Sequence, residues 1–140
     1  FMTGEVYALL TKHSLLRFSV DEATERLWER PAFAEAVLEV VEHPERFGEA
    51  LFGIRATGLL KDVGQADGTA RLSGLCIGLE LAGAGDYVKD GSTIEVVASG
   101  LHAELYRKAF DVLGIPHNIT DASEASRKGL FSAARQIYGG

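Results

Sequence analysis

An apolar strand, a tight turn of small residues and an amphipathic helix follow one another directly in this chain. The strand runs from Thr93 to Ala98, the turn contains Ser99 and Gly100, and the helix extends to Leu113. Such a junction exposes free backbone N–H groups at the helix start, where a nucleotide can lie. The same geometry also occurs in strand–helix units that bind nothing. The junction is therefore a candidate ligand site.

A second extended segment at 117–120 predicts a βαβ unit with parallel strands and a right-handed crossover. Asp121 and Glu124 have the spacing of a capping box for a last helix that ends at Gly139. Two strands do not form a stable parallel sheet alone, because both faces and both edges need partners. We therefore expect further strands upstream of Phe1, and hence a fragment of a longer polypeptide.

Residues 1–64 predict a helical segment. Apolar side chains recur there at helical spacing, and each stretch opens on a capping residue or a proline. The expected helix starts are Thr3, Asp21, Pro31 and Pro44. The first of these helices should end near His13, and the last should continue to the Gly58–Gly64 region.

The stretch from Thr69 to Tyr87 is apolar on nearly all sides, which predicts a buried helix. Its small residues let either a neighbouring backbone or a ligand come close, and tight packing is the preferred interpretation. These residues are Ser73, Gly74, Gly78, Ala82 and Gly83. The predicted fold is thus a helix-rich α/β domain, with a helical segment at 1–64 and a buried helix plus a βαβα unit at 65–140.

Composition narrows the function classes. A net charge of −6 without a Lys/Arg cluster argues against nucleic acid, but backbone amides at a helix start act locally and still allow ATP. No apolar run is long enough for a bilayer and no leader is visible, so we expect a cytoplasmic protein without membrane contact. Cys76 is expected to serve packing, and the four histidines are not spaced as metal ligands.

Two separated motifs occur in the order found in one enzyme family. The first is Phe1-Met2-Thr3-Gly4-Glu5 running into Leu9-Leu10 and His13-Ser14; the second is Leu72-Ser73-Gly74-Leu75 with Ile77-Gly78 and Glu80. Together they resemble 2-dehydro-3-deoxygalactonokinases, and the resemblance continues through 94–100 to about Gly129.

The resemblance implies the later part of the second domain of a two-domain sugar kinase with an actin-like, ribonuclease H-like ATPase fold. The family's first domain, with its phosphate loop, has no counterpart in this chain, so we expect the chain alone to be inactive. The parent enzyme would transfer the γ-phosphoryl group of ATP, with Mg²⁺, to the terminal hydroxyl of 2-dehydro-3-deoxy-D-galactonate in galactonate degradation.

Nucleotide-binding residues follow from the same resemblance, because the strand–helix turn matches the adenosine motif of this fold. They are Ala98, Ser99, Gly100 and Leu101. The ion, Mg²⁺, would be held mostly by phosphate and water, with no protein ligands predicted.

The predicted substrate-binding residues are Thr3, Gly4 and Glu5. The alternative interpretation is a capped helix start with a favourable acid in its first turn. That alternative explains Thr3 and Glu5 but not Gly4, because glycine is a poor helix residue unless something approaches it closely.

The catalytic base is not identified from the sequence and is expected outside this chain. Glu80, Asp86 and Asp90 are possible carboxylates whose spacing does not distinguish them from ordinary surface acids. A rival hypothesis is a non-catalytic helical interaction module without a nucleotide site. An unpaired sheet edge predicts that this fragment, if purified alone, associates with itself, as in a homo-oligomer, or with remaining upstream chain.

Overall fold

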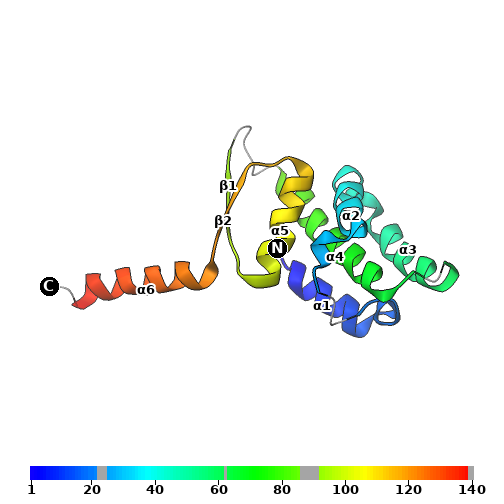
Figure 1. Cartoon of the computed structure of the whole chain (residues 1–140), viewed down its shortest axis with the longest axis horizontal. Helices are drawn as coiled ribbons and strands as arrows, with labels where there is room; N and C mark the ends of the chain where they lie inside the picture. The colour runs from blue at the N-terminus through cyan, green and yellow to red at the C-terminus, as the bar shows by residue number, and fades with distance from the viewer. Residues whose placement is uncertain (22–24, 62, 86–91, 139–140) are drawn as a thin grey trace.

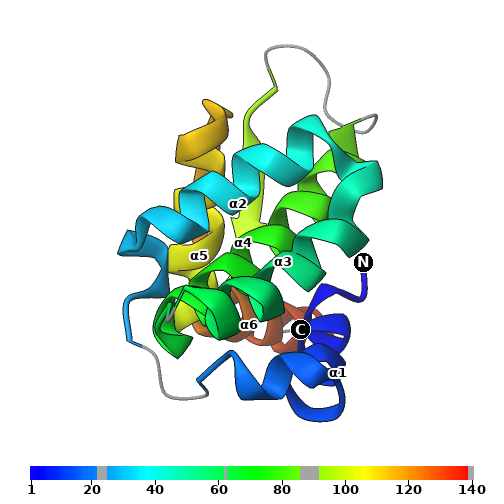
Figure 2. The ribbon, with the colours of Figure 1, turned by 90° about the vertical axis from the view of Figure 1, so that its right-hand side faces the viewer.

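One long helix, α4 (Gln65–Ala84), forms the centre of the structure, and four of the other described α-helices contact it (Figures 1 and 2). The computed structural model describes residues 1–21, 25–61, 63–85 and 92–138. Ten of the eleven residues at 68–78, all except Arg71, are buried. Within the described ranges, no helix combines the length and the apolar character needed to cross a membrane.

The most extensive contact between two described helices joins α4 to α2 (Pro31–Glu42). Pro31 opens α2 at its first turn, as predicted. A methyl group added at Gly74 would lie 2.9 Å from Ala36 Cβ, and one at Gly78 would lie 3.0 Å from the Val37 carbonyl oxygen. The glycines therefore let the two backbones approach, which confirms the prediction of tight packing.

Two groups of core side chains lie on different sides of α4. The first joins α4 to α1 (Thr3–His13), the 3₁₀ turn Leu15–Phe18, α2 and α3 (Phe47–Leu60), which follows a 3₁₀ turn at Pro44–Arg46. Its buried members are Leu16, Val20, Ala36, Val40, Ala50, Ile54, Leu72, Leu75 and Cys76. The second joins α2 and α4 to α5 (Gly100–Leu113) through Leu27, Phe33, Val37, Ala70, Ile77, Leu105 and Ala109.

The predictions at Thr3 and Asp21 differ from the structure. Thr3 does not cap α1, because Met2 is the N-cap and the Thr3 hydroxyl donates instead to Glu80. The helix expected from Asp21 is wrong where it is described: a turn at 25–26 leads into a 3₁₀ helix, Leu27–Glu29. Arg26 has φ 53°, a left-handed conformation that an α-helix does not accommodate.

The central helix begins at Gln65, four residues before the predicted Thr69. Thr69 lies inside it and its hydroxyl donates to the Gln65 carbonyl oxygen at 2.8 Å. The predicted end at Tyr87 lies outside the described residues, as do Asp86 and Asp90.

Strands β1 (Ile94–Val97) and β2 (His117–Thr120) pair in parallel on either side of α5 in the chain, which confirms the predicted pairing. In this register Ile94 lies opposite His117. Gly114 ends α5 with φ 66°, the left-handed conformation expected after a helix. Along both strands, partly covered residues alternate with exposed ones, so one face of this two-stranded sheet is open to solvent.

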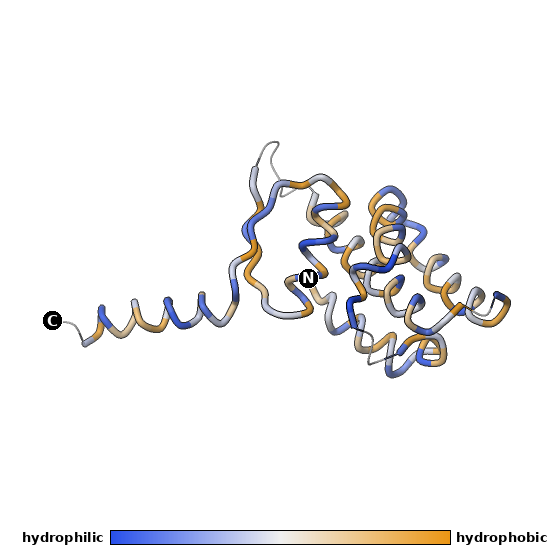
Figure 3. The backbone as a smooth tube through the Cα atoms, viewed as in Figure 1, coloured by the Kyte–Doolittle hydropathy of each residue, from blue (hydrophilic) through white to orange (hydrophobic). Residues whose placement is uncertain are grey.

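The last helix, α6 (Ala122–Tyr138), extends away from the rest of the structure (Figure 1). The backbone N–H of Glu124 donates to Asp121 Oδ1 at 3.0 Å, which is one of the two bonds of the predicted capping box. None of the described residues of α6 is buried, and Leu130, Phe131 and Ile137 are largely exposed. Hydrophobic and hydrophilic positions alternate along this helix (Figure 3). The predicted end at Gly139 lies outside the described residues.

The close contact between α2 and α4 makes Gly74 intolerant of even one methyl group. We expect Gly74→Ala to lower the free energy of unfolding by about 2 kcal/mol. The added methyl group would force the Phe33 carbonyl and Ala36, both on α2, to move away from α4. The matched control is Gly53→Ala in α3, where nothing lies within 4 Å of the added methyl group. That control should gain roughly 0.5–1 kcal/mol from its higher helix propensity. Urea unfolding followed by circular dichroism measures both, and equal effects of the two substitutions would contradict this packing.

Candidate functional site

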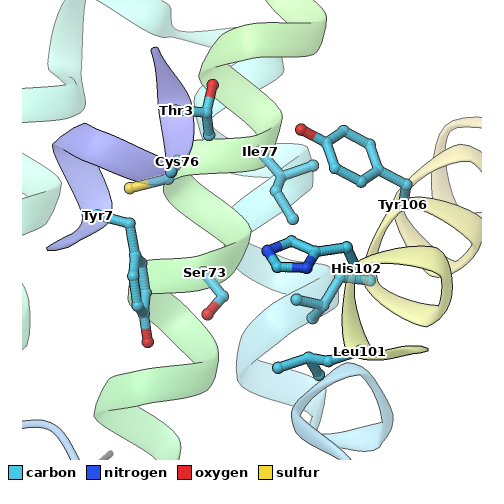
Figure 4. Close-up of a pocket in the computed structure, with 10 residues that line it drawn as sticks. Thr3, Tyr7, Ser73, Cys76, Ile77, Leu101, His102 and Tyr106 are labelled. Carbon is cyan, nitrogen blue, oxygen red and sulfur yellow. The ribbon is translucent and has the colours of Figure 1, made fainter. Parts of the chain in front are cut away.

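A cavity of about 160 Å³ lies where the first turns of α1 and α5 meet the middle of α4 (Figure 4). Its lining is mostly apolar or aromatic, and none of the lining residues is Asp, Glu, Lys or Arg. They are Thr3, Gly4, Tyr7, Ser73, Cys76, Ile77, Leu101, His102, Leu105 and Tyr106. Such a site suits a ligand that buries more apolar surface than charge.

The cavity brings together residues that the sequence analysis placed in separate motifs. Thr3 and Gly4 come from the predicted substrate segment, Ser73 from the second motif, and Leu101 from the predicted nucleotide segment. Glu5 is exposed and does not line the cavity. Two segments about a hundred residues apart in sequence thus meet across α4.

The other predicted nucleotide residues face different surroundings. Ala98 borders a wider hollow of about 600 Å³ between β1, α4 and α5. The Ser99 hydroxyl donates to Asp121 Oδ2 at 2.6 Å and accepts from the Ala122 N–H at 2.9 Å, so it fixes the start of α6. The hydrogen bond from Ser99 is the larger cause, and that from the Glu124 backbone N–H the smaller one, of an Asp121 pKa below its usual range.

Gly100 stands at the exposed start of α5 with φ 59°, a conformation that favours glycine. Nothing lies within 4 Å of the position that a Cβ atom would occupy. The glycine is therefore explained by its backbone conformation, and the space beside it is open to a ligand.

Glu80 connects the three helices around the cavity. Its carboxylate accepts hydrogen bonds from the Thr3 hydroxyl and, at 3.0 Å, from the Tyr106 hydroxyl. Burial raises the pKa of the Tyr106 phenol, and the neighbouring Glu80 carboxylate raises it further. With both hydroxyls as partners, Glu80 holds α1 and α5 in place against α4.

Sequence reasoning missed the aromatic part of the lining, namely Tyr7, His102 and Tyr106. Helical spacing indicates part of this lining, because residues four positions apart lie on the same face of a helix. Tyr7 follows Thr3 by four residues, and Ile77 follows Ser73 by four. Which helices meet at the cavity is not visible in that spacing. Burial raises the pKa of the lining thiol of Cys76 to about 12, in keeping with its predicted packing role.

In the part of the chain that the structure describes, no group of three or more His, Cys, Asp or Glu side chains could hold a metal ion.

The structure is a helix-rich α/β domain with a small cavity near two helix starts, whose lining holds no Asp, Glu, Lys or Arg. The chain matches the sequence profile of 2-keto-3-deoxy-galactonokinase over residues 1–133, and it belongs to that family.

Two curated relatives and one solved structure are similar over nearly the whole chain. A protein of Rhizobium meliloti (strain 1021), named as a probable 2-dehydro-3-deoxygalactonokinase, is 41% identical over 140 residues, which is 99% of this chain and 45% of that protein. The 2-dehydro-3-deoxygalactonokinase of Escherichia coli (strain K12) is 29% identical over 136 residues, which is 97% of this chain and 45% of that protein.

A crystal structure from Sinorhizobium meliloti, assigned as a 2-dehydro-3-deoxygalactonokinase, superposes with a TM-score of 0.88 at 40% identity. The match covers 99% of this chain and 44% of that one. The chain thus spans a little under half the length of the proteins it matches. The helix-rich fold with two parallel strands corresponds to part of that solved structure.

The bond between Tyr106 and Glu80 should contribute measurably to stability. We expect Tyr106→Phe to lower the free energy of unfolding by about 1 kcal/mol, because one partly buried hydrogen bond is lost. The matched control, Tyr138→Phe on exposed α6, should change nothing. Thermal unfolding below pH 9 measures the difference.

The pH dependence gives a second reading of the same contact. The pKa of Tyr106 in the folded state lies above its unfolded value of about 10. The contribution of the Tyr106 hydroxyl to the free energy of unfolding is therefore complete below about pH 10 and decreases as the pH rises further. A difference between Tyr106→Phe and the unsubstituted protein that grows with pH would contradict this assignment.

Proposed function

We propose that this chain forms part of an ATP-dependent kinase that phosphorylates 2-dehydro-3-deoxy-D-galactonate at its terminal hydroxyl. The observation that carries the proposal is family membership over residues 1–133, together with two relatives named for that reaction. We further propose that the whole enzyme has the two-domain, actin-like ATPase arrangement, of which this chain supplies the later part of the second domain. The chain alone is then expected to be inactive.

In this proposal the turn after β1 faces the nucleotide. The exposed Gly100, its left-handed backbone and the open space beside it support that role, since backbone N–H groups at a helix start can approach a ligand. Leu101 would contact the nucleotide from inside the cavity. Ala98 and Ser99 would shape the turn, because the Ser99 side chain already bonds the start of α6.

The segment Thr3-Gly4-Glu5 is proposed to lie beside the sugar acid. Its support is that Thr3 and Gly4 border the same cavity as Leu101. The exposed carboxylate of Glu5 can accept hydrogen bonds from sugar hydroxyls, and the Thr3 hydroxyl, which donates to Glu80, can still accept one.

ATP supplies the γ-phosphoryl group when bound, with Mg²⁺ held by its phosphates and water. Glu80 already accepts two hydrogen bonds within the protein, which favours a base elsewhere. We propose that the base lies outside this chain and that the residues here position the nucleotide.

The rival hypothesis, a helical interaction module without a nucleotide site, predicts that the full-length protein does not consume ATP. Coupled assay of ADP release with 2-dehydro-3-deoxy-D-galactonate separates the two hypotheses. The kinase proposal expects release that requires both ATP and the sugar acid. No release with this sugar acid, in an otherwise folded protein, would remove the proposal.

The nucleotide role of Gly100, at the start of α5, can be tested against Gly114, a second glycine with a left-handed backbone that directly follows the end of the same helix. Gly100→Ala and Gly114→Ala introduce the same methyl group at φ 59° and φ 66°, and each has open space around it. Both should cost about 1 kcal/mol in stability. Only Gly100→Ala should raise the KM for ATP, by roughly tenfold, because the methyl group occupies the ligand's space.

Steady-state kinetics of the full-length protein with varied ATP provides this measurement. If the two substitutions alter the KM for ATP equally, the effect comes from backbone strain and the assignment of the turn is wrong.

A further inference from the structure

One oxygen atom of Glu80 connects three helices. Glu80 belongs to α4, and its Oε2 atom accepts a hydrogen bond from the Thr3 hydroxyl of α1 and another, at 3.0 Å, from the Tyr106 hydroxyl of α5. Hydrogen bonds to a charged carboxylate are stronger than those between two neutral groups. The positions of α1 and α5 therefore both depend on where this one oxygen lies.

Other described carboxylates that connect separate parts of the chain pair with arginines. Glu39 of α2 accepts from Arg71 of α4 at 2.5 Å, and Asp67 of α4 accepts from Arg30 at 2.7 Å. Within the described ranges, Glu80 forms no such ion pair and has the two neutral hydroxyls as its hydrogen-bond partners. Each hydroxyl comes from a helix that also carries a proposed ligand segment.

Both hydroxyl donors lie near those ligand segments. Thr3 is the first residue of the segment proposed to lie beside the sugar acid. Tyr106 follows Gly100 by six residues on α5, which corresponds to about 9 Å along a helix. In Figure 4, the Tyr106 ring extends from α5 toward α4. A ligand that holds the start of either helix therefore also holds the hydroxyl that reaches Glu80.

The described core clusters do not fix α1 and α5 relative to each other. Tyr7 and Leu10 of α1 pack against the first cluster, whereas Leu105 and Ala109 of α5 belong to the second. The cavity of about 160 Å³ lies between these two helices and α4. Packing thus leaves room for α1 and α5 to shift, and their common hydrogen-bond partner sets their relative position.

The Glu80 side chain is itself only partly buried. It borders a hollow of about 350 Å³ beside the start of α1 and the hollow of about 600 Å³ beside β1. Ordering a side chain of this kind costs conformational entropy. The first ligand to hold its helix against Glu80 orders the carboxylate, so the second ligand binds without that cost.

We propose that Glu80 is a positioning residue that couples the two ligands of the proposed kinase, so that each bound ligand increases the affinity for the other. The inference rests on the proposed function and deepens it. The segment Thr3-Gly4-Glu5 stays beside the sugar acid, the turn at Gly100 stays beside the nucleotide, and Glu80 connects them. Because coupling is reciprocal, either ligand strengthens the binding of the other by the same factor.

Binding without turnover measures this coupling in the full-length protein. Isothermal titration calorimetry gives the Kd of 2-dehydro-3-deoxy-D-galactonate with and without a saturating non-hydrolysable ATP analogue, adenylyl imidodiphosphate with Mg²⁺. The ratio of the two Kd values is the coupling factor. It should be roughly fivefold or more in the unsubstituted protein. Equal Kd values would overturn the proposal.

Removal of either hydroxyl should abolish the coupling. Thr3→Val and Tyr106→Phe nearly keep the shape of the side chain, and each deletes one donor to Glu80. Each should bring the coupling factor to about one, and the double substitution should lower it no further, because the coupling needs both donors. Thr3→Ser keeps the hydroxyl and should keep the coupling. An equal loss in Thr3→Ser and Thr3→Val would contradict the role of the hydroxyl.

A purely structural role of Glu80 would lower stability without changing the coupling factor. The matched control is Thr11→Val, which removes a hydroxyl of α1 that donates to the carbonyl oxygens of Tyr7 and Ala8 in the same helix. This control should leave the coupling factor unchanged. If Thr3→Val and Tyr106→Phe lower the Tm but also leave the factor unchanged, Glu80 serves stability alone and the proposal is wrong.

The assay of ADP release separates this inference from the kinase proposal. An active kinase with the same coupling factor in all variants would overturn the role of Glu80 and leave the kinase proposal standing. Cooperative binding that depends on both hydroxyls, without any ADP release, would support the role of Glu80 and remove the kinase proposal. A folded full-length protein that binds neither ligand would overturn both.

Discussion

The close approach of α2 to the glycine-bearing face of α4 is the contact on which the rest of the structure depends. Gly74 and Gly78 offer no side chain, so the backbones of the two helices meet and α4 becomes buried along its middle. Once α4 is fixed in this way, α1 and α3 pack on one side of it and α5 on another.

The same helix supplies the site. Ser73 precedes Gly74 in the chain, and it lies on a face of α4 that α2 does not cover. The cavity lies between α4 and the N-terminal halves of α1 and α5, and Glu80 of α4 joins these two helices through Thr3 and Tyr106. Close packing on one face of α4 and an open cavity on another are therefore two consequences of how small residues are distributed along a single helix.

The outer part of the molecule has a different character. The two parallel strands leave one face exposed, and α6 carries apolar side chains that no described residue covers. Parallel sheets are usually covered on both faces. This incomplete burial agrees with the fact that the matched relatives are more than twice as long as the chain.

The sequence by itself determined the long helices, the parallel strand pair and the packing role of the glycines, because apolar periodicity and Pro or Gly positions act locally. It misassigned Thr3 as a cap and placed a helix at Asp21, because neither the attraction of Glu80 for the Thr3 hydroxyl nor the left-handed Arg26 is encoded in local spacing. Only the tertiary structure decided that Thr3, Ser73 and Leu101 border one cavity. Their meeting depends on how three helices cross, and crossing is set by side-chain packing between segments that are distant in the chain.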